Sequence, residues 1–516
     1  MTHPWFKVVV WSVVGSSALA LALLPFATAA LLLFVLLAMT LAVVNPVWIL
    51  YLAILSVPVQ ELLVLPGGLS LTQTALVLMI GAFALHTLIR PDDPQRFGRL
   101  LPPLALFVWT LALSAVGTPY NRSEALREVV RWATVPLIYL FGLLILDPVR
   151  LREDRGWAGV SWRIWGLVAA LLIAPAATAL VGLVQYWYGL GPPSFAIGGG
   201  RVRAYGTIGQ PNSFAGYLNQ AWPLAVGMAL FAIVGLMRGA RRLPALVALT
   251  GAGLAGGLLV AGLLASFSRG GWIGAVGGTL ALGVATVIML PAQLRRMVRQ
   301  LALVAAAGLI GLALLGGGGV LPATFTQRIA SLTNNLRLFD ARGVAITPAN
   351  FAVVERMAHL QAAWHMLERY PLTGVGPGNY SIAYEASPRP GERPISIRPW
   401  YVSRGHAHNY YLHIAAEAGI IGLTAYLILI GMVIVQAVRA VQTAEGWFWQ
   451  GIAAGSVGVV GAVAAHNLFE HLHVLNMGLQ LGTIWALLVL VEWHGLGTSQ
   501  PAPDRVPAGR NWLYER

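Results

Sequence analysis

Residues 164–188 read IWGLVAALLIAPAATALVGLVQYWY and contain no charged side chain. A helix of this length rises far enough to cross the ~30 Å hydrocarbon core of a bilayer. Comparable apolar windows, each of roughly 17 to 25 residues, predict about fourteen membrane spans. They begin near Val8, Phe26, Val47, Leu71, Leu100, Trp132, Ile164, Asn212, Leu243, Gly271, Leu301, Asn409, Ile452 and Val474. The sequence therefore predicts an all-α polytopic integral membrane protein with about 12–14 transmembrane helices.

The composition agrees with this class. Of the 516 residues, 57% are hydrophobic and 10% are charged, so a soluble fold would leave most of its apolar surface without a polar cover. Cysteine is absent, which excludes disulfides, thiolate metal sites and cysteine nucleophiles. The net charge of +14 is spread in short clusters between apolar runs and forms no basic domain, which argues against a nucleic-acid partner.

The N-terminal residues have some features of a secretory signal peptide. Lys7 precedes an apolar stretch from Val8 to Leu24, which is followed by the small residues Ala27-Thr28-Ala29. Another apolar run follows at once, which a cleaved leader would not require. We therefore predict an uncleaved first transmembrane helix.

Arginine placement predicts the orientation, because short cytoplasmic loops retain positive charge. With the N-terminus inside, the cytoplasmic connections hold Arg90, Arg96, Arg99, Arg150, Arg152, Arg155, Arg163, Arg238, Arg241, Arg242, Arg295, Arg296 and Arg299. This alternation puts both termini in the cytoplasm and the long hydrophilic segment from Pro322 to Gly405 on the outer face. A loop of that length is more often functional than idle.

The spans and the outer loop divide the chain into five consecutive parts. No internal repeat or low-complexity linker separates them, so a single membrane domain is the economical description. The parts are N-terminal transmembrane helices (1–161), central transmembrane helices with arginine-bearing outer loops (162–321), the long outer loop (322–407), C-terminal transmembrane helices (408–493) and a cytoplasmic tail (494–516).

The outer loop contains one predicted amphipathic helix. Apolar residues recur at helical spacing and the pattern stops at Tyr370-Pro371. The residues of the predicted apolar face are Val353, Met357, Leu360, Trp364 and Leu367. The glycine-rich run Gly374 to Asn379 follows and must turn. A phosphate-binding P-loop is a weak alternative, since no Gly-Lys-Ser/Thr follows.

Three arginines lie in short outer loops, where the positive-inside bias disfavours them. Arg201, Arg203 and Arg269 are therefore expected to be retained for another reason than topology. A guanidinium group binds phosphate with two parallel donors and keeps its charge, which suits an anionic lipid diphosphate at the membrane surface. Interfacial snorkelling is the alternative. Arg122, Arg127 and Arg131, in contrast, are explained by ion pairs with Glu124 and Glu128 on one helix.

Histidines gather where the outer loop meets the twelfth predicted span. A neutral imidazole there can take a proton from an attacking hydroxyl, and His408 stands at the start of the span. His413 is about 140° around an ideal helix from His408, so the two are not expected to share one small cleft. Zinc held by His406, His408 and His413 is an alternative, but no aspartate or cysteine lies close in sequence and the spacing matches no familiar zinc signature. Glu417, inside the apolar span, should pair with another group, an arginine being one candidate.

A second polar group, residues 466–473 with the sequence HNLFEHLH, lies at the outer connection between the last two spans. Interfacial anchoring explains most of it. A secondary role in shaping a substrate cleft is the alternative.

Several motifs resemble the O-antigen ligase and polymerase superfamily. The segment from Arg203 to Asn212 is similar to its Arg-x-x-Gly-x-x-x-x-Pro-Asn element, and Ser268 to Trp272 is similar to its Ser-Arg-Gly-Gly element. Residues 356–380 resemble the outer-loop helix with its Pro-x-x-Gly-x-Gly ending. His408-Asn409, followed by Gly419 and Gly422, resembles the His-Asn…Gly…Gly signature of the ligase branch. The likeness runs from Arg203 to Gly422 in the expected order.

The resemblance implies a multi-pass protein of the bacterial cytoplasmic membrane that acts on its periplasmic face. It implies an inverting, metal-independent transfer of a glycan from undecaprenyl diphosphate to an acceptor hydroxyl on lipid A-core or another surface glycan, with no cofactor. Carried onto this chain, His408 is the expected base, and Arg203 and Arg269 are expected to stabilise the leaving diphosphate. The residues expected to bind substrate are Arg201, Asn212, Asn409, His406 and Glu417.

Other functions remain as alternatives at this level. Polymerisation of repeat units uses the same fold, and protein O-glycosylation is a third variant. From another class, a transporter or flippase is conceivable, because Pro175 and the glycines in residues 251–257 suit broken helices as well as close packing. A transporter site belongs near the bilayer midplane, whereas the candidate arginines and histidines lie at the outer boundary, and this favours an enzyme.

Overall fold

The computed structural model describes residues 45–62, 70–89, 96–147, 156–296, 339–347, 350–388, 390–397 and 405–499, together with residues 15, 151 and 300. Several predictions fall outside this part of the chain: the spans near Val8, Phe26 and Leu301, the outer-loop stretch 322–338 and most of the C-terminal tail. The orientation arginines Arg90, Arg150, Arg152, Arg155 and Arg299 lie outside it as well.

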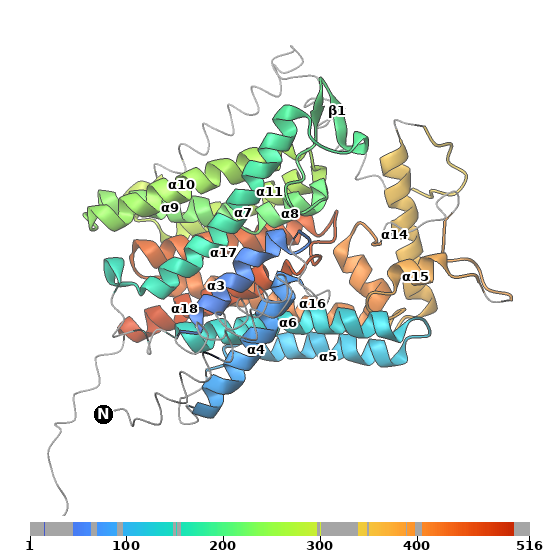
Figure 1. Ribbon diagram of the computed structural model, residues 1–516, viewed down its shortest axis with the longest axis horizontal. Coiled ribbons are helices and arrows are strands. Elements are labelled where there is room, and N and C mark those ends of the chain that lie inside the picture. Colours follow the sequence, from blue (N-terminus) through green and yellow to red (C-terminus); the bar gives the residue numbers. More distant parts are fainter. Residues whose placement is uncertain are drawn as a thin grey trace, which may run out of the picture.

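The described residues confirm an all-α polytopic architecture (Figure 1). The helices are α3 (Val47–Ser56), α4 (Leu71–Ile89), α5 (Leu101–Gly117), α6 (Arg122–Leu146), α7 (Trp162–Tyr188), α8 (Pro211–Asn219), α9 (Trp222–Met237), α10 (Arg242–Ala265), α11 (Arg269–Met289), α14 (Phe351–Arg369), α15 (Tyr380–Glu385), α16 (Tyr410–Thr443), α17 (Gly446–His466) and α18 (Gly478–Ser499). Within the described chain, eight helical segments are long and apolar enough to cross a membrane, with α8 and α9 counted as one. The only described strands are β1 (Ala196–Gly198) and β2 (Arg201–Val202), which form a small antiparallel hairpin.

Close packing of small residues fixes α17 against its neighbours α9 and α11. A Cβ atom added at Gly277 on α11 would lie 2.6 Å from the side chain of Ala465 and 2.8 Å from the carbonyl oxygen of Gly461. A Cβ at Gly227 on α9 would lie 2.7 Å from the backbone nitrogen of Gly455. Backbones approach this closely only where glycine occupies the contact. The three helices therefore form a rigid unit that holds the ends of α11 and α17 in register.

The breaks in the helices do not lie where the transporter alternative required them. α7 continues through Pro175, and α10 continues through residues 251–257. The break within α16 lies at Gly419, which has φ 65° and ψ −168°. A Cβ at Gly419 would lie 2.2 Å from the carbonyl oxygen of Leu372, so glycine is required by both conformation and space.

The glycine-rich segment that follows α14 fills the break in α16. Backbone N–H groups of Val375 and Gly376 donate to the carbonyl oxygens of Ala416 and Glu417 at 3.0 and 2.8 Å. In return, the N–H of Ile420 donates to the carbonyl oxygen of Pro371 at 2.8 Å. The backbone groups that the break would leave unpaired in an apolar environment are thereby satisfied.

The outer-loop helix α14 ends where the sequence predicted, with Tyr370 as its last cap residue. Its predicted apolar face is only partly correct, because Trp364 is 54% exposed. Alanines and His359 form much of the buried face instead, and His359 stacks on Tyr384 with ring centroids 5.2 Å apart. The buried face packs mainly against α16 and also contains Val354, Met357 and Met366, whereas Trp364 lies outside it.

Candidate active site

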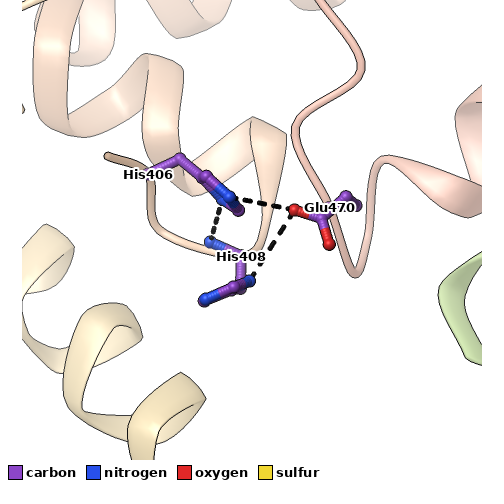
Figure 2. Close-up of side chains that lie close together, drawn as sticks. All are labelled: His406, His408 and Glu470. Carbon is purple, nitrogen blue, oxygen red and sulfur yellow. Dashed lines mark hydrogen bonds and ion pairs between the residues drawn. The ribbon is translucent and has the colours of Figure 1, made fainter. Parts of the chain in front are cut away.

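Three segments far apart in sequence meet at the end of the bundle beside α14. They are residues 405–409 before α16, the connection between α17 and α18, and the start of α8. Figure 2 shows the centre of this cluster, where Glu470 faces His406 and His408. A Glu470 carboxylate oxygen lies 3.0 Å from Nε2 of His406 and 3.7 Å from Nδ1 of His408. The Glu470 side chain is 4% exposed, so its charge is held inside the protein.

The hydrogen bonds assign the proton on His406. The backbone N–H of His408 donates to Nδ1 of His406 at 3.1 Å, so that nitrogen is an acceptor. In the neutral ring the proton then sits on Nε2 and is donated to Glu470. Both ring nitrogens of His406 are occupied, which leaves no lone pair for a substrate proton.

His408 differs from His406 in both backbone and side chain. It has a φ of 54°, a left-handed conformation that non-glycine residues rarely adopt and that is common at functional sites. Its Nδ1 faces Glu470, and neither ring nitrogen has a hydrogen-bond partner at normal distance among the described residues. With a proton on Nδ1 directed at the carboxylate, Nε2 carries a free lone pair. The arrangement suits a general base oriented by a carboxylate.

Asn409 holds this segment in place. Its Oδ1 accepts from the N–H of Leu412 at 2.9 Å and caps α16, while its Nδ2 donates to the carbonyl oxygen of Leu468 at 3.2 Å. The N–H of Tyr410 also donates to the carbonyl oxygen of Asn467 at 2.7 Å. These bonds tie the start of α16 to the α17–α18 connection, so Asn409 brings His408 and Glu470 together from within the protein.

A chain of hydrogen bonds joins Glu470 to Arg203. Nε of Arg203 donates to the carbonyl oxygen of Ser266 at 2.9 Å, and Nη2 donates to Oδ1 of Asn212 at 2.8 Å. Nδ2 of Asn212 then donates to the other oxygen of Glu470 at 2.8 Å. The predicted Arg…Pro-Asn element thus folds onto itself and onto the histidine cluster.

Burial sets the protonation of the two imidazoles. It lowers the pKa of His406 and of His408 to about 4 each, although the nearby carboxylate opposes the shift. Burial alone would raise the pKa of Glu470, but the two imidazoles and, further off, Arg356 hold it below its ordinary value. At neutral pH the site therefore contains two neutral rings and one carboxylate.

Sequence reasoning missed three residues of this site. Glu470 is its centre, although it was grouped with residues assigned to interfacial anchoring. Arg356 and His359, one turn apart on α14, face the cluster: Arg356 affects the electrostatics of Glu470 and His408, and His359 meets the His408 ring edge-on at 5.6 Å. Arg356 could have been found by the argument that selected Arg203, since it too is an arginine on the predicted outer face.

The helical angle used to separate His413 from His408 does not describe how the two are placed. His408 precedes α16, which begins at Tyr410, so the angle between positions on an ideal helix does not apply to the pair. The His413 ring lies 4.8 Å from that of His471, which lies 6.1 Å from that of His406. His413 therefore belongs to the same histidine cluster, behind His406.

Glu417 has a different partner from the predicted arginine. Its carboxylate accepts from the backbone N–H groups of Gly378 and Tyr380 at 2.9 and 3.0 Å, and Nε2 of His413 lies 3.5 Å away. Two backbone donors satisfy a buried carboxylate without a cation. The geometry gives Glu417 a structural task, which is to hold the glycine-rich segment against α16.

The remaining predicted arginines lie in different surroundings from Arg203. Arg201 packs over the rings of Trp187 and Tyr186, with its guanidinium carbon 4.6 and 5.2 Å from their centroids. Arg269 is half-buried and is the first residue of α11, whose next residue, Gly270, lies against the His466 ring. Arg127 and Arg131 form the predicted ion pairs with Glu124 and Glu128.

A metal was set aside because no aspartate or cysteine lies close in sequence and the spacing matches no familiar zinc signature, but the fold brings the distant Glu470 to the histidines. Potential ligand atoms of His406, His408 and Glu470 all lie within 4.8 Å of one another. A metal would need the Nε2 lone pair of His406, however, and the hydrogen bond accepted by Nδ1 places a proton on Nε2. The arrangement therefore fits a group of hydrogen-bonded side chains better than a set of metal ligands.

The fold and this site define a multi-pass membrane protein with a buried, polar, histidine-centred cluster at one end of its bundle. Residues 254–427 match the family model described as O-antigen ligase, which confirms the resemblance to that superfamily. Members of this family are bacterial inner-membrane proteins. The match includes Arg269, α14 and His408, whereas Arg203, Asn212 and Glu470 lie outside it. No curated protein matches the chain.

Proposed function

We propose that the protein is a ligase-type glycosyltransferase that moves a glycan from a polyprenyl diphosphate carrier, such as undecaprenyl diphosphate, to an acceptor hydroxyl. The single observation that carries the proposal is the position of Glu470. One of its oxygens faces a histidine with a free ring nitrogen, and the other is linked through Asn212 to Arg203. A base and a binding group for an anionic leaving group are thus built around one carboxylate.

In the proposed step, Nε2 of His408 takes the proton of the acceptor hydroxyl as its oxygen attacks the anomeric carbon. The bond between that carbon and the diphosphate oxygen breaks, its electron pair leaves with the diphosphate, and the configuration inverts. A positioned base contributes ~10²–10⁴ in rate. The pKa of His408 leaves the ring unprotonated at neutral pH, and a bound diphosphate, being anionic, would raise that pKa toward the working range.

Three guanidinium groups support the departure of the diphosphate in this proposal. Arg203 is held by Ser266 and Asn212, and Arg356 makes no hydrogen bond or ion pair with the residues that the structure describes. Arg269 starts α11 beside the same connection. Negative charge grows on the leaving oxygen in the transition state, where fixed donors stabilise it more than in the ground state.

The family description favours a single transfer over polymerisation, and lipid A-core or another surface glycan is the proposed acceptor. The transporter alternative loses its support because Pro175 and residues 251–257 lie in unbroken helices. The polar cluster lies at helix ends and not in the middle of the spans, which also supports an enzyme. The predicted charge distribution favours a periplasmic site and cytoplasmic termini.

Reconstitution tests the proposal directly. The purified protein is placed in liposomes with a defined undecaprenyl-diphosphate oligosaccharide and several acceptors, and products are identified by mass. A ligase gives one transfer per acceptor, whereas a polymerase lengthens the carrier-bound chain. His408→Gln should abolish product, and His494→Gln, which changes a histidine near the far end of α18, should not. Absence of any product with the wild-type protein would refute the proposal.

A further inference from the structure

We propose that Asn212 is a positioning residue that orients the Glu470 carboxylate toward His408 and links it to the arginine assigned to the diphosphate. This inference rests on the proposed function for its catalytic meaning. The position of the Asn212 side chain, however, is given by contacts within the protein. These contacts assign Asn212 to the protein's own hydrogen-bond network and not to the substrate.

The orientation of the Asn212 amide is fixed by its two neighbours. Arg203 can only donate, and an ionised Glu470 can only accept, so Oδ1 must face Arg203 and Nδ2 must face Glu470. Both contacts are 2.8 Å long. No other orientation of the amide satisfies both partners, and neither aspartate nor leucine could replace it in both roles.

The backbone makes this orientation rigid. Pro211 begins α8 and Asn212 is its second residue, so the amide projects from the first turn of a helix whose following residues are mostly buried. The N–H of Phe214 donates to the carbonyl oxygen of Gln210 at 2.8 Å and secures that turn. A side chain on a regular element holds a neighbouring group more tightly than one on a free loop.

The Asn212 contact determines which acceptor positions Glu470 offers to the histidines. Asn212 occupies one carboxylate oxygen, and the other faces His406 and His408 and accepts from the backbone N–H of His471 at 3.4 Å. Without the amide, the carboxylate loses its donor on the first oxygen and is held only through the second. Its charge is then less stabilised by hydrogen bonds, so it attracts a proton on His408 more strongly.

Other charged or titratable groups act on His408 from every side. The groups that stay the same when Asn212 is substituted are Glu470 and His406, Arg356 and His359 of α14, and His471 and His413 beyond His406. Arg203 is different, because the substitution removes its hydrogen bond to Asn212.

The first test needs no substrate. The apparent pKa of His408 is obtained from the pH dependence of its modification by diethyl pyrocarbonate, located by peptide mass spectrometry, in wild type, Asn212→Ala and Ser213→Ala. We expect Asn212→Ala to raise the apparent pKa by at least about half a pH unit. Ser213→Ala, the neighbouring control, should leave it unchanged. Equal pKa values in wild type and Asn212→Ala would overturn the inference even if transfer occurs.

The second test uses transfer rates. Asn212→Ala should lower kcat at least about tenfold, because it loosens Glu470, and any change in the KM for the donor reports the lost contact with Arg203. Combined with Glu470→Gln it should cost much less than the product of the two single losses, since most of its effect passes through the same carboxylate. Multiplicative losses in the double variant would refute the route through Glu470. Wild-type transfer checks the proposed function separately.

Discussion

Glu470→Gln is the substitution that most directly probes the site. The carboxylate accepts from Asn212 at 2.8 Å and from His406 at 3.0 Å, and it lies 3.7 Å from Nδ1 of His408. Glutamine has the same size but keeps only one acceptor oxygen, so its NH₂ group must face one of these donors. A donor buried against a donor costs ~1–3 kcal/mol. The fold should survive this loss, but the orientation of His408 should not.

The expected rate loss follows from the role of the carboxylate. If orientation of His408 accounts for most of the contribution of a positioned base, transfer falls by ~10²–10⁴-fold, equal to about 3–5 kcal/mol at 1.36 kcal/mol per tenfold. The carboxylate also raises the pKa of His408 against the effect of burial. Its removal should therefore move the acidic limb of kcat/KM to lower pH, the opposite direction from Asn212→Ala.

The assay is transfer in proteoliposomes from about pH 3 to 8 at matched protein content, so that the range extends below the pKa of His408. Glu445→Gln, at the other end of α17, is the control for loss of one carboxylate. Thermal unfolding in detergent checks that the variant is folded. A folded Glu470→Gln protein with a rate within threefold of wild type, or with an unchanged acidic limb, would refute the assignment of Glu470 as the group that orients the base.

Other substitutions test the remaining parts. Lysine at Arg203 or Arg269 should lower transfer at least about tenfold at matched expression, because an ammonium lacks two parallel donors; wild-type rates in both variants would remove the diphosphate assignment. His408→Gln should lose at least ~10²-fold and His406→Gln less than about tenfold, and the reverse order in the same assay would exchange their roles. EDTA should leave the rate unchanged, whereas a loss restored by one metal would contradict the hydrogen-bonded site. Gly277→Leu should lower the thermal unfolding midpoint in detergent and reduce the stability by ~1–3 kcal/mol, since its Cβ would lie 2.8 Å from the backbone of α17. An unchanged midpoint would mean that α11 and α17 can separate without loss of stability.

The helices were predictable because the membrane imposes a simple requirement. A run such as residues 164–188 must be helical to satisfy its backbone in hydrocarbon, whatever its neighbours are. The end of α14 was predictable for a similar local reason, since Pro371 cannot continue a helix. The exposed Trp364 was not, because burial on α14 depends on which of its faces packs against α16 in the tertiary fold.

The site was predictable only where one segment carries the signal. Arg203 breaks the positive-inside bias in its loop, and His408 is a titratable residue at the start of a membrane span. Both lie in the cluster. Glu470 breaks no such rule, since an acid at a membrane boundary is ordinary, and only the tertiary fold brings it to His408. The partners of Glu417 were missed for another reason, because backbone donors leave no trace in side-chain identity.

The break at Gly419 has a consequence for engineering and for biogenesis. The backbone groups around the break lack hydrogen-bond partners until residues 371–376 pack against α16. The segment after α14 and helix α16 must therefore fold together. Exchange of the segment after α14 between related proteins should therefore fail when that segment is moved alone. Residues 371–378 and 416–421 form one transplantable module, and a chimera should carry both pieces from the same parent.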